Sequence, residues 1–200
     1  MKNSKIEWTN HTANLWHGCT KVHEGCDNCY AEALSKRWGD NVWGNDNPRK
    51  EVKSIWNQLS NMQNIAEKAG EVHRVFVVSM MDIFEKPMPL IDSKGNPKML
   101  PILNEFPYKT EVLRKILFEK IQLGHYPNLD FLLLTKRPSN INRYIPDSWR
   151  VNPPKNVMFG TSPVNQQTFD TLVSQLKRVN GRRFLSIEPQ IDRIELRHLS

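Results

Sequence analysis

Apolar residues recur along the chain in two alternating patterns. Four short runs are continuous and rich in residues that favour β-structure, and each has the length of a single strand. They cover residues 75–78, 131–134, 157–159 and 184–187. Because the runs are continuous and do not alternate with polar residues, we expect strands that are covered on both faces, as in parallel sheets with helical crossovers.

Between these runs, apolar residues are spaced three and four positions apart, which is typical of the buried stripe of a helix. Such stripes occur in residues 52–69, 112–121 and 169–179, and Gly181 is placed to cap the last helix. The alternation of strands and helices predicts an α/β fold, either an open sheet or a partial (β/α) barrel of mostly parallel strands.

A proline-rich stretch interrupts this alternation. Residues 84–109 contain five prolines and a polar turn at 93–96. A connection of this length is unusual in a compact domain and is typical of a lid, a docking loop or a surface insertion. With no internal repeat or boundary, residues 1–200 are otherwise expected to form a single domain.

Composition and charge narrow the classes of partner. No stretch approaches the ~20 consecutive apolar residues that span a bilayer, and the polar N-terminus lacks the pattern of a signal peptide. We therefore expect a cytoplasmic protein without a membrane partner. The 28 basic residues outnumber the 21 acidic ones, giving a net charge of +7, which favours a polyanionic partner such as nucleic acid.

The strongest chemical signal is a cluster of all three cysteines in residues 19–29. An odd number of cysteines in a reducing compartment favours metal ligation over disulfides. Cys26 and Cys29 are separated by two residues, as in many metal-binding pairs, and Gly18 and Gly25 let the loop curl so that Cys19 reaches the same point. A helix beginning at Tyr30 would favour deprotonated sulfur through its N-terminal dipole.

Spacing alone leaves the identity of the metal open. Three thiolates suit an iron–sulfur cluster in which one iron keeps a free position. A structural zinc site needs a fourth ligand, for which His17 and His23 are close in sequence. In the zinc alternative the chain is a non-catalytic module that binds nucleic acid or a protein partner. Unligated thiols buried as small apolar groups are a further alternative.

Six segments resemble, in order along the chain, a family of phage and prophage proteins. These segments are KIEWT at 5–9, GCTKV at 18–22, GCDNCYAE at 25–32, SMMDIF at 79–84, LTKRP at 134–138 and FLSIEP at 184–189. The family looks similar to radical S-adenosylmethionine (SAM) enzymes and is distantly similar to spore photoproduct lyase. It shares the long spacing of six residues between Cys19 and Cys26.

The resemblance implies a partial (β/α) barrel in which Cys19, Cys26 and Cys29 hold a 4Fe–4S cluster. In such enzymes the open iron chelates the amino and carboxylate groups of SAM, and one electron from the cluster cleaves the sulfonium to give a radical that abstracts a substrate hydrogen. The resemblance therefore implies an iron–sulfur radical enzyme of phage type. By analogy with the lyase, its substrate would be nucleic acid. A degenerate barrel that has lost this chemistry is the alternative within the same family.

Polar residues follow each predicted strand, where parallel α/β folds bind their ligands. These residues are Ser79, Asp82, Thr135, Lys136, Arg137, Thr161, Ser162, Asn165 and Glu188. Individually they also have structural interpretations: Thr161, Ser162 or Asn165 would cap the following helix, Lys136 and Arg137 would be solvated loop charges, and Glu188 would only end a strand.

With SAM as the cofactor, the strand-end residues acquire specific expected roles. Ser79 and Asp82 would receive its amino group, whereas Ser162 and Glu188 would bond its ribose hydroxyls.

Two basic side chains at the strand ends are expected to meet an anion. Lys136 or Arg137 would bind the carboxylate of SAM or a substrate phosphate, because a guanidinium offers two parallel hydrogen bonds to such groups.

The C-terminal segment raises a separate expectation. Members of the resembled family usually continue past residues 184–189 with another strand, whereas this sequence ends at Ser200. We therefore expect a shortened form whose exposed sheet edge attracts a protein partner or a second copy of the chain.

Overall fold

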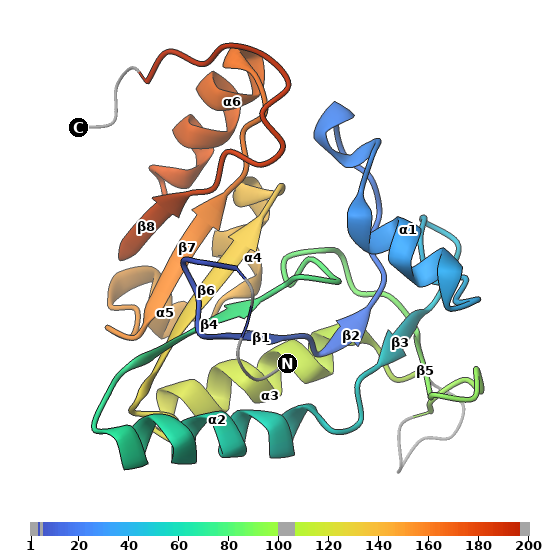
Figure 1. Ribbon diagram of the computed structural model, residues 1–200, viewed down its shortest axis with the longest axis vertical. Coiled ribbons are helices and arrows are strands. Elements are labelled where there is room, and N and C mark those ends of the chain that lie inside the picture. The colour runs from blue at the N-terminus through green and yellow to red at the C-terminus, as the bar shows by residue number, and fades with distance from the viewer. Residues whose placement is uncertain (1–3, 5, 100–106, 197–200) are drawn as a thin grey trace.

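The computed structural model describes residues 4, 6–99 and 107–196, which form a mixed α/β fold (Figure 1). A five-stranded sheet has the order β1-β4-β6-β7-β8, and every pair of neighbours is parallel. Its strands are β1 (His11–Ala13), β4 (His73–Val77), β6 (Leu129–Thr135), β7 (Val157–Thr161) and β8 (Arg182–Leu185). The four predicted strands and their parallel arrangement are therefore confirmed.

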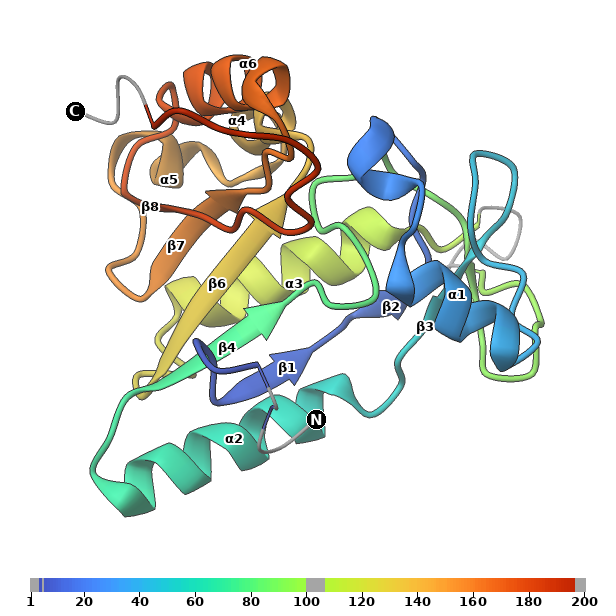
Figure 2. The same ribbon diagram turned by 45° about the horizontal axis from the view of Figure 1, so that its top comes forward.

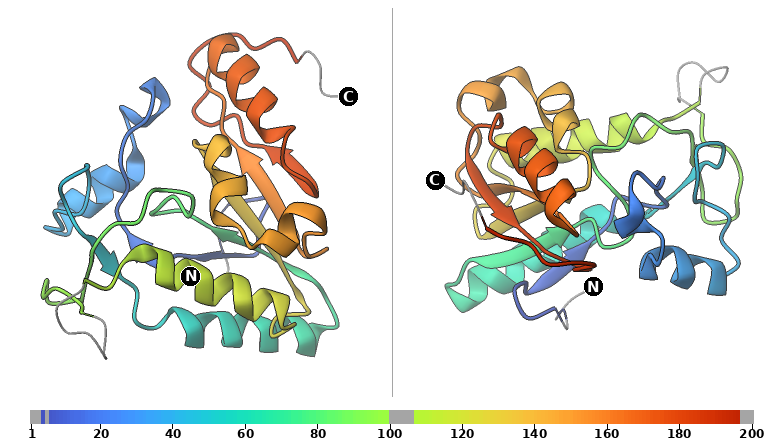
Figure 3. Two further views of the ribbon diagram at one scale, coloured as in Figure 1. Left: turned by 180° about the vertical axis from the view of Figure 1, so that it is seen from behind. Right: turned by 90° about the horizontal axis from the view of Figure 1, so that it is seen from above.

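Helices join the parallel strands as crossovers. They are α2 (Ile55–Ala69), α3 (Thr110–Gln122), α4 (Ile141–Tyr144), α5 (Asp147–Val151) and α6 (Gln166–Leu176). All five lie on one side of the sheet, as the view from behind in Figure 3 shows. The predicted helical stripes face that sheet, because Leu59, Leu117 and Phe169 are buried.

The prediction for the last helix was wrong at its C-terminal end. Helix α6 ends at Leu176 with Lys177 as its cap, whereas Gly181 lies beyond it with a φ of 100°. Glycine is needed there because the chain turns directly into β8 through a left-handed conformation. Val179 nevertheless stays in the core, which explains why the apolar stripe extended past the helix.

The expectation that every strand is covered on both faces holds for the central strands only. Residues of β6 and β7 are almost entirely buried, whereas Arg182 and Arg183 of β8 are exposed. Among the described strands β8 pairs with β7 alone, so it forms an edge of the sheet. Because consecutive residues of a strand point to opposite faces, the start of β8 is exposed on both faces.

The sheet is curved, and aromatic side chains bring its two edges together. Trp8, just before β1, has its ring centre 4.9 Å from that of Phe76 on β4 and 6.2 Å from that of Phe184 on β8. Phe184 lies directly over Gly160, where a Cβ atom would come within 2.4 Å of the Phe184 ring. A side chain at position 160 would therefore displace the aromatic ring that links the edges.

A second, three-stranded sheet has the order β2-β3-β5 and lies beside the first. It consists of β2 (Trp16–His17), β3 (Arg49–Glu51) and β5 (Leu90–Ile91). The described part of the proline-rich segment 84–109 thus supplies a strand to a sheet. Residues 100–106, including Pro101, lie outside the described residues. Whether the segment acts as a lid stays a prediction.

The described helices are short or amphipathic. In the part of the chain that the structure covers, none combines the length and the apolar content of a membrane-spanning segment.

Candidate functional site

A cavity of about 560 Å³ lies between the cysteine-containing loop and the carboxyl ends of the parallel strands. The three cysteines and the six residues expected to bind SAM all line it: Cys19, Cys26, Cys29, Ser79, Asp82, Lys136, Arg137, Ser162 and Glu188. Figure 2 shows the arrowheads of β4 and β6 pointing toward this loop. The topology thus brings together residues that are up to 169 positions apart, because parallel strands end at the same edge of the sheet.

Two glycines shape the cysteine loop, for different reasons. Gly18 has a φ of 111°, and a Cβ atom there would lie 2.1 Å from the carbonyl oxygen of Val42. At Gly25 there is no room for a side chain, because the Cγ1 atom of Val164 would lie 2.5 Å from a Cβ atom there. The Gly18 amide also donates to the Met80 carbonyl at 3.0 Å, which fixes the start of the loop to the end of β4.

The three cysteines are free and half-buried. Cys26 ends a short 3₁₀ helix (Glu24–Cys26), and Cys29 immediately precedes α1 (Tyr30–Arg37), so the predicted helix after the cluster is confirmed. Among the described residues, no three Cys, His, Asp or Glu side chains are arranged as a metal-binding group. The sulfurs therefore share a cavity but would have to be drawn closer together by the loop to bind one centre.

Neither neighbouring histidine lines the cavity. The His17 ring lies near Trp38, with 5.8 Å between ring centres, and the Nδ1 atom of His23 accepts a hydrogen bond from the Gly25 amide at 3.1 Å. Burial lowers the pKa of both imidazoles. The cavity therefore offers three thiols and the carboxylates of Asp82 and Glu188, but no imidazole.

Asp82 and Arg137 bind each other. The Arg137 Nη1 atom lies 2.6 Å from the Asp82 carboxylate, which also accepts hydrogen bonds from the Thr135 hydroxyl at 2.8 and 2.9 Å and from the Phe84 amide at 2.9 Å. Burial is the largest single influence on Arg137 and alone would lower its pKa, but Asp82, Cys19 and Glu85 together outweigh it and raise that pKa overall. Both charged groups are thus occupied within the protein.

Arg137 also connects this ion pair to the cysteine loop. Its Nη1 atom lies 3.6 Å from the Cys19 sulfur, and its Nη2 atom donates to the Thr20 carbonyl. A guanidinium has a fixed planar fork, so these contacts define the position of Cys19 relative to β6. Arg137 and Asp82 are therefore arranged to hold the loop, and their predicted contact with a ligand stays a prediction.

Cys19 should react slowly with alkylating agents in the metal-free protein. Burial and then the Asp82 carboxylate raise the pKa of this thiol to about 12, although Arg137 opposes the shift. At pH 8 its thiolate fraction is on the order of 10⁻⁴, and only the thiolate attacks. Iodoacetamide labelling followed by peptide mass spectrometry should find Cys19 modified last, with a rate that rises tenfold per pH unit. Labelling of Cys19 at the rate of an unfolded control would contradict this.

Three predicted residues remain available to a ligand. No hydrogen bond or ion pair engages the side chains of Lys136, Ser162 or Glu188 within the part of the chain that the structure describes. Ser162 is only 1% exposed, so its hydroxyl depends on whatever occupies the cavity. Ser79 differs, because its hydroxyl accepts a hydrogen bond from Asn14 at 2.8 Å. The capping interpretation is confirmed for Asn165, which caps α6.

Sequence reasoning missed a buried ion pair behind the site. Arg49, with no exposed surface, donates to both carboxylate oxygens of Glu85 at 2.9 and 2.7 Å and to the Thr20 hydroxyl at 2.8 Å. It also donates to the carbonyl oxygens of Val42, Gly44 and Asn47. Arg49 thereby fastens residues 42–47 to the cysteine loop. No local sequence motif indicates this ion pair, since its two residues are 36 positions apart.

An apolar wall completes the cavity and was also missed. It consists of Ile6, Trp8, Trp43, Phe76, Val78, Met81 and Leu134. Most of these residues read in the sequence as ordinary core positions. Only the curvature of the sheet turns them toward a cavity.

Comparison with known proteins gives a family without an assigned activity. The family model described as "Protein of unknown function (DUF5131)" matches residues 3–200. No curated protein and no solved structure matches the chain. Since the family model spans nearly the whole sequence, the chain belongs to DUF5131, a family of proteins of unknown function.

Proposed function

We propose that this protein is an iron–sulfur enzyme of the radical-SAM type, in which Cys19, Cys26 and Cys29 hold a 4Fe–4S cluster and SAM occupies the rest of the cavity. The observation that carries the proposal is that three free thiols and the polar residues of four strand ends line one space of about 560 Å³. That volume lies in the range of about 300–1,000 Å³ that is usual for cofactor sites.

The donor set fits such a cluster better than a zinc ion. Three thiolates leave one iron of a 4Fe–4S cluster open, whereas structural zinc requires a fourth protein ligand. His17 and His23 do not line the cavity, which argues against a zinc site of three cysteines and one histidine, and the Asp82 carboxylate is already bound to Arg137 and Thr135. When bound, the cluster and SAM would supply one-electron reduction of a sulfonium, which no side chain of the protein can perform.

The available side chains suggest how SAM is oriented. Lys136 has no ion-pair partner among the residues that the structure describes and would receive the carboxylate of SAM. Ser162 and Glu188 would bond the ribose hydroxyls, and the apolar wall around Trp8 and Phe76 would cover the adenine ring. In this proposal Arg137 and Asp82 position Cys19 and leave ligand binding to Lys136.

The same proposal extends to the fold. A curved parallel sheet whose edges meet through Trp8 and Phe184, with its helices on one side, supports a partial (β/α) barrel of the radical-SAM kind. The net charge of +7 supports nucleic acid as the substrate, and free thiols suit a reducing cytoplasm.

Anaerobic SAM cleavage tests the function. Cluster-loaded, dithionite-reduced protein should convert SAM to methionine and 5′-deoxyadenosine, and Lys136→Met should raise the KM for SAM by about tenfold while keeping its iron. Lys53→Met removes a charge from a lysine outside the cavity and should leave the KM unchanged. Cluster-loaded protein that neither binds nor cleaves SAM would refute the enzyme proposal. One zinc per chain and no sulfide would favour the non-catalytic module.

A further inference from the structure

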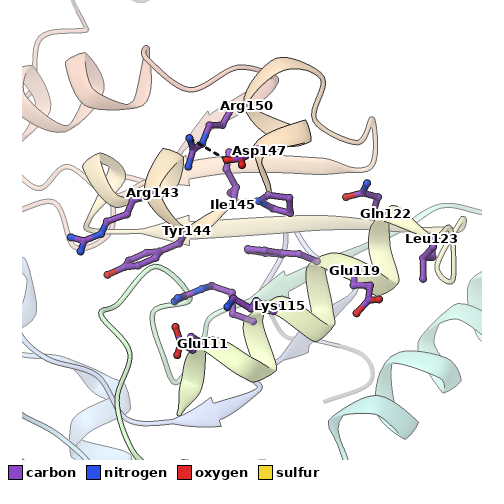
Figure 4. Close-up of a pocket in the computed structure, with 13 residues that line it drawn as sticks. Glu111, Lys115, Glu119, Gln122, Leu123, Arg143, Tyr144, Ile145, Asp147 and Arg150 are labelled. Atoms are coloured by element: carbon purple, nitrogen blue, oxygen red, sulfur yellow. Dashed lines mark ion pairs between the residues drawn. The ribbon is translucent and has the colours of Figure 1, made fainter. Parts of the chain in front are cut away.

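A second pocket, of about 800 Å³, lies between α3 and residues 143–150 and shares no lining residue with the cysteine cavity. Figure 4 shows Glu111, Lys115 and Glu119 on α3 along one side of this groove, with Arg143 and Tyr144 on the other. An ion pair between Arg150 and Asp147, 3.2 Å apart, lies at its rim.

The unusual residue of this groove is Arg114, which is 2% exposed. Its Nη1 atom donates to the carbonyl oxygens of Ile83 at 2.9 Å and Glu85 at 3.1 Å. Its guanidinium carbon lies 4.1 Å from the centre of the Tyr144 ring. Within the described residues no carboxylate comes within ion-pairing distance of it, and no acceptor engages its Nε or Nη2 atoms.

Two other arginines with little exposed surface show what this environment normally requires. The buried Arg49 forms a two-point ion pair with Glu85, and the partly buried Arg137 forms a single-point ion pair with Asp82. A buried charge is costly unless it is paired, and the carbonyl contacts and aromatic face around Arg114 supply no negative charge. Burial accordingly lowers the pKa of Arg114, and Tyr144, Glu111 and Asp82 oppose this only in part. The structure leaves this cation without a counter-ion.

We infer that the groove binds a phosphate group, with Arg114 as its central ligand and Lys115 and Arg143 as flanking cations. A guanidinium fork with free N–H groups matches two phosphate oxygens, whereas a lone ammonium does not. The acidic residues Glu111 and Glu119 on the same wall restrict the site to one localised anionic group. The phosphate would belong to a nucleotide or to a nucleic-acid strand, because Tyr144 offers an aromatic surface beside it.

The test uses the full chain, without metal, and needs no enzymatic activity. Isothermal titration calorimetry at constant ionic strength should detect binding of AMP and of a short oligodeoxythymidine, with inorganic phosphate weaker than either. Arg114→Met should weaken binding of the best probe by about tenfold or more, since a hydrogen-bonded charge is lost. Arg74→Met removes an exposed charge on β4, outside the groove, and should leave the affinity unchanged.

Each outcome decides the inference. AMP binding that exceeds that of the oligonucleotide identifies a nucleotide site, and the reverse order identifies a strand. If Arg114→Met does not fold, a double variant in which Lys115 and the exposed Arg143 are both replaced by glutamine takes its place. This double variant should weaken binding at least as strongly as either single replacement. The inference would be overturned if the native chain bound none of the probes at millimolar concentration. It would also be overturned if every groove variant bound the probes with unchanged affinity.

Discussion

Replacing Cys26 with serine should abolish incorporation of the proposed iron–sulfur cluster, because a cluster held by three thiolates cannot lose one of its few protein ligands and remain bound. Anaerobic reconstitution followed by iron and sulfide analysis of the desalted protein measures the effect. We expect about four iron per chain in the native protein and close to none in Cys26→Ser. Cys19→Ser and Cys29→Ser should behave alike.

Histidine substitutions are the matched control for this experiment. His17 and His23 are close to the cysteines in sequence but do not line the cavity. His17→Gln and His23→Gln should therefore retain full iron, whereas a site built from three cysteines and one histidine would lose its metal in one of them. Undiminished iron in all three cysteine variants would contradict cysteine ligation.

Replacing Arg49 with methionine should cost about 3–5 kcal/mol of folding stability, the usual penalty for leaving a buried charge without its partner. Glu85, 2% exposed, would keep its carboxylate in the interior, and among the described residues its remaining ion-pair partner would be Arg137, at 3.9 Å. Urea unfolding of the metal-free protein, followed by circular dichroism, measures the free energy of unfolding.

Two further variants separate charge from packing. The double change Arg49→Met and Glu85→Met removes both charges and should recover part of the loss, because well-packed apolar side chains often replace a buried pair without large cost. Arg74→Met, at an exposed position, should change stability by no more than about 0.5 kcal/mol. A loss below about 1 kcal/mol in Arg49→Met would show that the pair does not support the loop.

Strand and helix positions could be predicted from the sequence because buried apolar residues are spaced differently along strands and along helices. The runs at 131–134 and 157–159 became β6 and β7, and the stripes became α2, α3 and α6. The convergence of Ser79, Lys136, Ser162 and Glu188 followed from one rule, that parallel strands end at a common edge. These predictions rest either on a local pattern of residues or on the parallel arrangement of the strands.

The partners of individual charges could not be predicted, because they depend on contacts between distant residues. Arg137 was expected to meet a ligand, but Asp82, 55 positions away, takes its guanidinium. Arg49 and Arg114 are buried although arginine is rarely buried, and no local pattern in the sequence indicates it. Only the fold decides which basic side chains are enclosed and which stay free for a ligand.

The identity of the centre that the three cysteines are proposed to bind decides the function, and one measurement addresses it directly. Protein purified anaerobically from cells, without reconstitution, should be brown and contain about four iron and four acid-labile sulfides per chain, with zinc well below one equivalent. A folded preparation with stoichiometric zinc, or with no metal at all, would contradict the account.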